Sequence, residues 1–374
     1  MSDIKIVQGK RMFDAVRDRG IIIMAANTRM TMVTEGIFQA AKEAKSVVMV
    51  ELAKSESNLE DGYTGLLPMD LSIHTQEAAK KTGFDGWALH ADHLTVKRGD
   101  SAEIDAIKSL VKAQIDAHFT SFAIDASHLF NFEGGDLEEE LSKNIEATTE
   151  IAHFIKDHYG SDDFGLEVEV GEIGRKNDKG MVLTRPEEAA TFIKALNRNG
   201  VEPQVIAIAN GSSHGNIYDD RGNLIKQISI DIPQTVAVAK ALRDMGSPVR
   251  IAQHGITGTP RHLIRSAFPH GDIIKGNVGT FWQNLVFDTF KVYEPDLYDQ
   301  ILEWTVNTYR AKYPTKGKEE IFGKMGKMAI KEFFDDIYAV GDDTREAITA
   351  QSRAQALMFF KAFNSYNSGK LLDG

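Results

Sequence analysis

The sequence predicts an α/β protein built as a (β/α)8 TIM barrel, because one unit repeats eight times: a short apolar run, a polar loop and a helical stretch. Such a barrel gathers its active site at the carboxyl ends of its strands. The eight runs are residues 21–26, 47–52, 86–90, 121–125, 165–170, 205–209, 249–253 and 272–278. Helical periodicity between them is clearest at residues 38–44, 104–118, 137–158, 186–197, 233–245 and 260–268.

Local signals support these elements. Pro186 and Pro260 stand where a helix tolerates proline in its first turn. Glycines suited to a left-handed cap follow helical stretches at Gly83, Gly200 and Gly246. The rival fold, a doubly wound open sheet, needs a glycine-rich phosphate loop after its first strand, whereas residues 25–28 read Ala-Ala-Asn-Thr.

More residues follow the eighth strand than one closing helix needs. Four further helices are predicted at residues 282–293, 297–313, 326–338 and 345–365. We therefore expect a barrel domain over residues 1–283 and a C-terminal helical extension over residues 284–374. The extension is expected to pack on the barrel or on a second subunit of a homodimer or higher homo-oligomer.

Composition excludes several classes of function. The 43 basic and 54 acidic residues give a net charge of −11, which argues against a nucleic-acid surface. The chain has no cysteine, so any transition-metal site must use His, Asp and Glu. The N-terminus lacks the layout of a signal peptide, and the apolar runs are too short to span a bilayer. We expect a cytoplasmic protein without a membrane partner.

Three histidines stand at the ends of three predicted strands, namely His93, His214 and His254. A lone histidine is most simply a hydrogen-bonded side chain, but three that converge from different strands favour a divalent metal with one open coordination position. Gly215 and Gly255 follow two of them and would let the backbone approach a ligand closely. Zinc or another divalent ion is the expected cofactor.

Carboxylates accompany these histidines. Asp92, beside His93, is a candidate acid/base for proton abstraction next to a carbonyl, or alternatively a helix cap. Glu167 and Glu169 alternate with apolar residues and so point into the barrel, where a carboxylate is costly unless paired or near a metal. Glu169, nearer the strand end, is an additional candidate metal ligand.

The inward-facing Lys275 on strand eight is expected to pair with Glu167, and a Schiff-base lysine is the less favoured alternative. His90, two residues before Asp92, is expected to be a structural histidine. Few lysines stand near the strand ends, so a substrate phosphate would be held by loop amides and hydroxyls after strands seven and eight. The substrate-binding candidates are Asn27, Gly215, Gly255, Thr257, Gly258, Lys275 and Thr280.

These residues, in this order, resemble the class II, metal-dependent fructose-bisphosphate aldolases. The resemblance covers roughly residues 27–283. The matching segments are His90-Ala-Asp92-His93, Asp125-Ala-Ser127, Leu166-Glu-Val-Glu169-Val-Gly171, His214-Gly215, His254-Gly-Ile-Thr-Gly258 and Lys275-Gly-Asn277-Val-Gly-Thr280.

The resemblance implies zinc on the three histidines with Glu169 nearby, and a monovalent cation as a second candidate ion. It implies that Asp92 acts on the aldehyde oxygen and that Asn277 contacts the enediolate. Dihydroxyacetone phosphate would be held by Gly215, Gly255, Thr257 and Thr280.

The chain also departs from the family pattern. The acidic pair that usually follows the strand-five motif, and that carries a proton-transfer glutamate, is replaced by residues 174–178, so Glu172 or Asp178 is expected to substitute for it. Gly279 and Phe281 replace aspartates of the last motif, and the lysine that usually follows His214-Gly215 is missing.

The favoured substrate is fructose 1,6-bisphosphate. Tagatose bisphosphate or another ketose phosphate is the first alternative. A metallohydrolase on the same barrel and a non-catalytic sugar-phosphate-binding relative are the further alternatives. The hydrolase usually wants His-x-His after strand one, which residues 20–27 lack.

Overall fold

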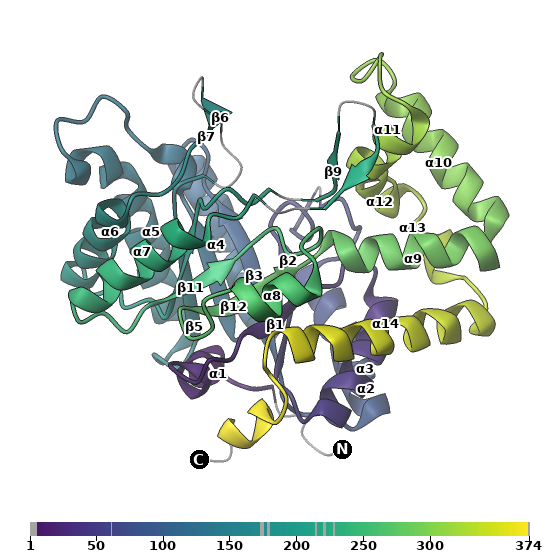
Figure 1. Cartoon of the computed structure of the whole chain (residues 1–374), viewed down its shortest axis with the longest axis horizontal. Helices are drawn as coiled ribbons and strands as arrows, with labels where there is room; N and C mark the ends of the chain where they lie inside the picture. Colours follow the sequence, from purple (N-terminus) through teal and green to yellow (C-terminus); the bar gives the residue numbers. More distant parts are fainter. Residues whose placement is uncertain are drawn as a thin grey trace.

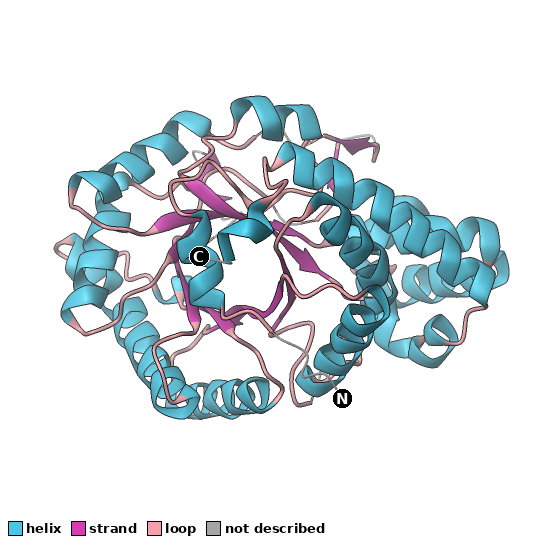
Figure 2. Cartoon of the chain, turned by 90° about the horizontal axis from the view of Figure 1, so that it is seen from below, coloured by secondary structure: helices cyan, strands magenta, loops and turns pink. Residues whose placement is uncertain are grey.

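The protein forms a closed barrel of eight parallel strands surrounded by helices, in a computed structural model (Figures 1 and 2). The structure describes residues 6–60, 62–172, 176–177, 180–213, 215–219, 222–226 and 229–372. The strand order around the barrel is β1-β12-β11-β8-β5-β4-β3-β2, and β1 closes the ring by pairing with both β12 and β2.

All eight predicted strands are present. They are β1 (Ile23–Asn27), β2 (Val48–Ala53), β3 (Trp87–Thr95), β4 (Ser121–Asp125), β5 (Gly165–Val170), β8 (Val205–Ile208), β11 (Arg250–Gln253) and β12 (Ile273–Val278). Two short antiparallel pairs lie outside the barrel, β6 (Lys176–Asn177) with β7 (Gly180–Met181) and β9 (Ile217–Tyr218) with β10 (Leu224–Ile225). The (β/α)8 barrel prediction is confirmed.

Helices cover the outside of the barrel. They are α1 (Gly9–Val16), α2 (Thr34–Ala44), α3 (Pro68–Thr82), α4 (Ser101–Asp116), α5 (Leu137–Tyr159), α6 (Pro186–Arg198), α7 (Ile232–Asp244), α8 (Arg261–Ala267) and α9 (Thr280–Tyr293), with 3-10 turns at Thr31–Val33 and Ser127–Leu129. Helix α3 is the helical stretch predicted before Gly83, which caps it in the left-handed conformation, and small and polar residues such as Ser72, Thr75 and Ala78 form much of its buried face. Among the described helices, none has the length and apolar character needed to cross a bilayer.

The chain after α9 is helical, as the sequence predicts. Its elements are α10 (Pro295–Tyr309), α11 (Lys318–Met325), a 3-10 turn at Gly326–Met328, α12 (Ala329–Glu332), α13 (Phe334–Tyr338), α14 (Asp342–Ala362) and a final 3-10 turn at Ser368–Leu372. Helices α10 and α11 stand beside the barrel, and α14 returns across its outer surface to pack on α2, α8 and α9 (Figure 1). The expected boundary between residues 283 and 284 falls inside α9, so a division there would cut a helix.

The barrel interior changes from apolar to charged along its axis. At its amino end, Met12, Phe13 and Val16 of α1 pack against inward-facing residues such as Ile23 and Met49. Toward the carboxyl end, the inward-facing side chains are ionisable, including the fully buried Lys275. Because α1 and the apolar layer fill one end, the inward-facing ionisable side chains around Lys275 lie toward the other.

The packing of α14 on the barrel depends on Gly36 in α2. A Cβ atom at Gly36 would collide with the Ser352 hydroxyl and the Thr349 carbonyl oxygen of α14. We expect Gly36→Ala to lower the free energy of unfolding by about 1–3 kcal/mol, the usual cost of overpacking, as measured by urea denaturation. Gly341→Ala is the control because a Cβ there meets open space. An equal or smaller loss in Gly36→Ala would contradict the packing described.

Candidate metal centre and active-site pocket

The end of β3 places two adjacent residues in the pocket. The sequence predicts that this strand ends at His90, but in the structure it continues to Thr95. Its pairing with β4 shifts between Ala91 and Leu94. Regular strands send consecutive side chains to opposite faces. Here His93 has a left-handed backbone (φ 39°), which is uncommon for a residue other than glycine. Asp92 and His93 consequently both line the pocket.

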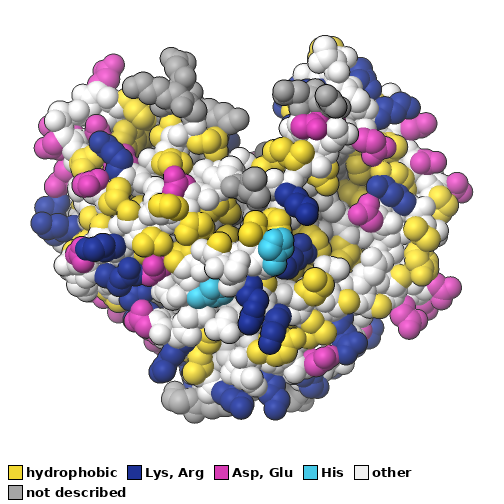
Figure 3. Space-filling view, viewed as in Figure 1, with side chains coloured by type: hydrophobic (Ala, Val, Ile, Leu, Met, Phe, Trp, Pro, Cys, Tyr) yellow, Lys and Arg dark blue, Asp and Glu magenta, His cyan; other side chains and the backbone are white. Residues whose placement is uncertain are grey.

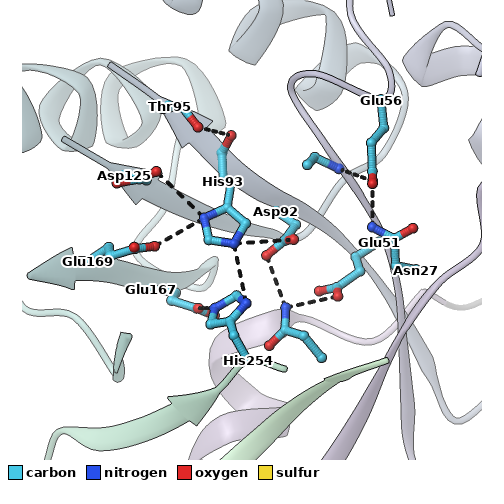
Figure 4. Close-up of polar contacts among 12 residues, drawn as sticks. Asn27, Glu51, Glu56, Asp92, His93, Thr95, Asp125, Glu167, Glu169 and His254 are labelled. Atoms are coloured by element: carbon cyan, nitrogen blue, oxygen red, sulfur yellow. Dashed lines mark hydrogen bonds and ion pairs between the residues drawn. The ribbon is translucent and has the colours of Figure 1, made fainter. Parts of the chain in front are cut away.

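Two of the three predicted metal-binding histidines meet at the spacing that a shared zinc ion requires. The distance from His93 Nε2 to His254 Nδ1 is 3.3 Å (Figure 4). Two imidazole nitrogens bound tetrahedrally to one zinc ion at about 2.0–2.1 Å lie about 3.3–3.4 Å apart. The Asp92 carboxylate is 3.9 Å from His93 Nε2, on the same side of the ring. His214 lies outside the described residues.

Carboxylates surround the outer nitrogens of both rings. His93 Nδ1 lies 3.0 Å from Glu169 and 3.6 Å from Asp125, and His254 Nε2 lies 3.8 Å from Glu167. Carboxylates at these positions orient metal-binding imidazoles and increase their basicity. Glu169, a predicted metal ligand, therefore faces the nitrogen of His93 that points away from His254.

The charges of this cluster influence one another strongly. Burial opposes protonation of His93, but Asp92 and Glu169 raise its pKa well above the usual value. Burial and the nearby Asp125 raise the pKa of Glu169 to about 8. Burial alone would raise the pKa of Asp125, but the contact with His93 lowers it below the usual value. An excess of carboxylates around two imidazoles is an environment that attracts a cation.

A buried ammonium lies beneath these histidines. The Nζ atom of Lys275 is 2.8 Å from Glu167, 3.2 Å from Glu51 and 3.6 Å from Asp92, and the side chain is fully buried. The predicted Glu167–Lys275 pair is thus present. His90 is also fully buried and contacts Ser121 and Lys275 at 2.7 Å and 3.0 Å, as expected of a structural histidine.

Lys275 has neither the exposure nor the charge state of an imine-forming lysine. Burial alone would lower its pKa, but Glu167 and the other carboxylates raise it above the usual value. An imine requires a neutral amine. The ammonium also lies below the pocket wall, so its predicted contact with substrate is not seen in this structure.

Asp92 is held by neighbours suited to an ionised base. The Asn277 Nδ2 atom donates to Asp92 at 3.0 Å and to Glu51 at 2.9 Å. Burial alone would raise the pKa of Asp92, but the charges of His93 and Lys275 lower it to about 2. Asp92 lies within β3, so it does not cap a helix and that alternative is wrong.

Glu51 is a further carboxylate that contacts Lys275 and Asn277. Burial and the charge of Asp92 raise the pKa of Glu51 to about 8, whereas Lys275 lowers it. Its Oε1 accepts a hydrogen bond from Asn277, and its Oε2 lies 3.2 Å from the Lys275 ammonium, which stabilises the ionised form. We therefore describe Glu51 as a carboxylate.

The pocket above this cluster has a volume of about 450 Å³. It opens where the molecule is hollowed, between the barrel and the C-terminal helices (Figure 3). Its lining includes most predicted substrate-binding residues: Asn27, Gly215, Gly255, Thr257 and Thr280. Gly258 lies in the adjacent turn and does not line the described pocket.

Of the two candidates for proton transfer, the structure describes only Glu172. Glu172 lines the pocket, with its carboxylate 3.7 Å from His128 Nδ1. Asp178 lies outside the described residues.

Three pocket cations were missed in the sequence analysis, namely Arg29, Lys324 and Lys327. Arg29 is neutralised by Glu56 at 2.7 Å and also donates to Gln283 at 2.9 Å. Its position two residues after Asn27, at the end of the first predicted strand, was the only sequence signal.

Lys324 and Lys327 come from α11 and the following 3-10 turn, far from every motif. The Lys327 ammonium lies 5.1 Å from the centre of the Tyr63 ring and forms no ion pair within the described part of the chain. Burial and the nearby Arg29 lower the pKa of Lys327. The predicted scarcity of lysine around the pocket is therefore wrong, because the C-terminal segment contributes two.

Together, the fold and the site define a barrel enzyme in which imidazoles and an adjacent ionised carboxylate meet at the strand ends. The profile of the family "Fructose-bisphosphate aldolase class-II" matches residues 7–340. The fructose-bisphosphate aldolase of Thermus caldophilus is 30% identical over 271 residues, which cover 69% of this chain and 71% of that protein. The probable fructose-bisphosphate aldolase of Bacillus subtilis (strain 168) is 27% identical over 329 residues, covering 86% and 96% of the two chains.

The solved structure of the Campylobacter jejuni fructose-bisphosphate aldolase has the same fold, with a TM-score of 0.60 at 18% identity. The match covers 98% of this chain and 97% of that chain. The chain belongs to the class II fructose-bisphosphate aldolase family and is an enzyme of the lyase class.

The buried ammonium gives a test of how this site is stabilised. Lys275→Met would leave Glu51, Glu167 and Asp92 without their shared cation. Breaking a buried ion pair costs about 3–5 kcal/mol, and we expect a loss of that size in urea denaturation. Lys291→Met, which removes an exposed pair with Asp288, should cost no more than about 1 kcal/mol. Equal stability of the two variants would contradict this role.

Proposed function

We propose that this protein is a zinc-dependent aldolase that reversibly cleaves fructose 1,6-bisphosphate into dihydroxyacetone phosphate and glyceraldehyde 3-phosphate. The observation that carries the proposal is the 3.3 Å spacing of the His93 and His254 nitrogens, with the ionised Asp92 beside them in the pocket. Tagatose bisphosphate or another ketose phosphate is the alternative substrate.

The metal would be held by His93, His254 and, as the third ligand, His214. The two described imidazoles suit zinc because their spacing matches tetrahedral coordination. Glu169 and Glu167 would orient the rings through their outer nitrogens. A bound zinc ion polarises a substrate carbonyl and stabilises the negative charge that develops on its oxygen.

Asp92 would be the acid/base. In the cleavage direction its carboxylate accepts the proton of the C4 hydroxyl, the C4–O bond becomes the aldehyde carbonyl, and the C3–C4 bond breaks. The electron pair of that bond remains with the dihydroxyacetone phosphate fragment as an enediolate. A proton is then added at C3, for which Glu172 and Asp178 are the candidates. In the condensation direction the same steps run in reverse.

The two phosphates would occupy different walls of the pocket. Gly215, Gly255, Thr257 and Thr280 offer amides and hydroxyls for the dihydroxyacetone phosphate end. Lys327, together with Arg29 and Lys324, offers positive charge for the far phosphate. Lys327 is the most suitable of the three because it has no carboxylate partner within the described residues.

Several predictions from the sequence remain predictions. These are the cytoplasmic location, the homo-oligomeric state and a second, monovalent ion. The metallohydrolase and the non-catalytic relative are not proposed, because the chain belongs to an aldolase family.

The roles of metal and base can be separated with two variants. His254→Ala should remove most bound zinc and nearly all turnover, because it deletes a ligand. Asp92→Asn should retain zinc but lose roughly 100- to 10,000-fold in rate, the usual contribution of a positioned acid/base. Zinc is measured by elemental analysis, and activity by release of dihydroxyacetone phosphate. Full zinc occupancy with wild-type turnover in His254→Ala would exclude the metal site.

The far-phosphate assignment predicts a change in selectivity. Lys327→Met should lower kcat/KM for fructose 1,6-bisphosphate at least tenfold, because a charged hydrogen bond contributes roughly 1.5–3 kcal/mol. The same variant should leave kcat/KM for fructose 1-phosphate unchanged. Lys331→Met is the matched control, since Lys331 is exposed and does not line the described pocket. An equal effect on both substrates would contradict the assignment.

A further inference from the structure

Glu51 is a buried acid for which the proposed reaction has no use. It lies in β2, opposite His90 of β3 in the barrel register, and its side chain is fully buried. Burying a carboxylate is costly unless its contacts repay desolvation. Neutralising Lys275 does not require Glu51, because Glu167 is already 2.8 Å from the same ammonium.

The contacts of Glu51 are duplicated by Asp92. The Asn277 amide nitrogen donates to Glu51 Oε1 at 2.9 Å and to Asp92 Oδ1 at 3.0 Å. The Lys275 ammonium lies 3.2 Å from Glu51 and 3.6 Å from Asp92. Two carboxylates therefore share one amide group and one ammonium.

This sharing determines which way the Asn277 amide points. A side-chain amide has two N–H donors, and here each is directed to a different carboxylate. Rotation by 180° would place the carbonyl oxygen against both negative charges. In the observed orientation, Oδ1 is buried and has no hydrogen-bond partner among the described residues. An acceptor left in this state beside the pocket suits a hydroxyl group of a ligand.

We infer that Glu51 is a positioning residue of the active site. It holds the Asn277 amide so that Nδ2 supports Asp92 and Oδ1 accepts a hydrogen bond from a substrate hydroxyl. The inference rests on the proposed aldolase function, and it assigns a role to a residue outside the motifs that resemble the family. Glu51 borders the pocket, and the role assigned to it acts through Asn277.

Glu51→Gln tests this role with little change in side-chain volume. Glutamine has one acceptor oxygen where two are needed, because both Asn277 and Lys275 are donors. Its oxygen would turn to the Lys275 ammonium, and its own NH2 would then face the NH2 of Asn277. The amide of Asn277 would have to move or rotate. Misplacement of a catalytic group costs about 100-fold, so we expect kcat/KM for fructose 1,6-bisphosphate to fall 10- to 100-fold, mainly through kcat.

A double-mutant cycle with Asn277→Ala separates positioning from packing. If Glu51 acts through Asn277, Glu51→Gln should change kcat/KM less than threefold once the Asn277 amide is absent. Losses that multiply in the double variant would overturn the inference, as would wild-type kcat/KM in Glu51→Gln. Glu103→Gln is the matched control, since Glu103 is buried, accepts from backbone amides and does not line the described pocket. It should leave kcat/KM unchanged.

A readout without turnover keeps this inference distinct from the proposed function. In protein labelled with 15N-asparagine, the Asn277 side-chain amide should show slow hydrogen exchange in the wild type and at least tenfold faster exchange in Glu51→Gln. Unchanged exchange would overturn the positioning role even in an active aldolase. Slow wild-type exchange without cleavage of any ketose phosphate would overturn the proposed function alone. If Glu51→Gln does not fold, Glu51→Asp enters the same cycle, because its shorter side chain withdraws the acceptor oxygen from Asn277, and the same losses are expected.

Discussion

The active site depends on one buried positive charge. Lys275 lies inside the barrel with three carboxylates around its ammonium, and these carboxylates contact the other residues of the site. Glu167 reaches His254, Asp92 lies beside His93, and Glu51 holds Asn277. Without the ammonium these acids would repel one another in a medium that solvates charge poorly. One residue therefore allows the inner end of the pocket to be both charged and ordered.

A second constraint is the irregular end of β3. A regular strand would send either Asp92 or His93 away from the pocket. The pairing shift and the left-handed backbone of His93 bring both side chains to the same side. Non-glycine residues hold such a conformation only where the surrounding structure enforces it. Here the ring of His93 is fixed by Glu169 and His254.

The pocket has opposite charges on different walls, although the whole chain carries a net charge of −11. Carboxylates and imidazoles occupy the floor, where a cation would be stabilised. Arg29, paired with Glu56, and the two lysines Lys324 and Lys327 also line the pocket, where the lysines would stabilise an anion. Two of these three cations come from the C-terminal helices, which pack beside the barrel (Figure 1). The extension thus completes the pocket as well as covering the barrel surface.

The sequence by itself determined the barrel, its eight strands and most residues at the strand ends. Apolar periodicity is a local property, and a parallel barrel brings all carboxyl ends of its strands to one face. The inward direction of Glu167 and Glu169 and the Glu167–Lys275 pair follow from strand alternation, which is also local. The pairing shift of β3, the contact of Glu169 with the outer nitrogen of His93 and the sharing of Asn277 between Glu51 and Asp92 were decided only by the tertiary structure. So was the arrival of Lys327 at Tyr63, 264 residues earlier in the chain. These contacts join elements distant in sequence, and their geometry depends on how the whole barrel and its extension pack.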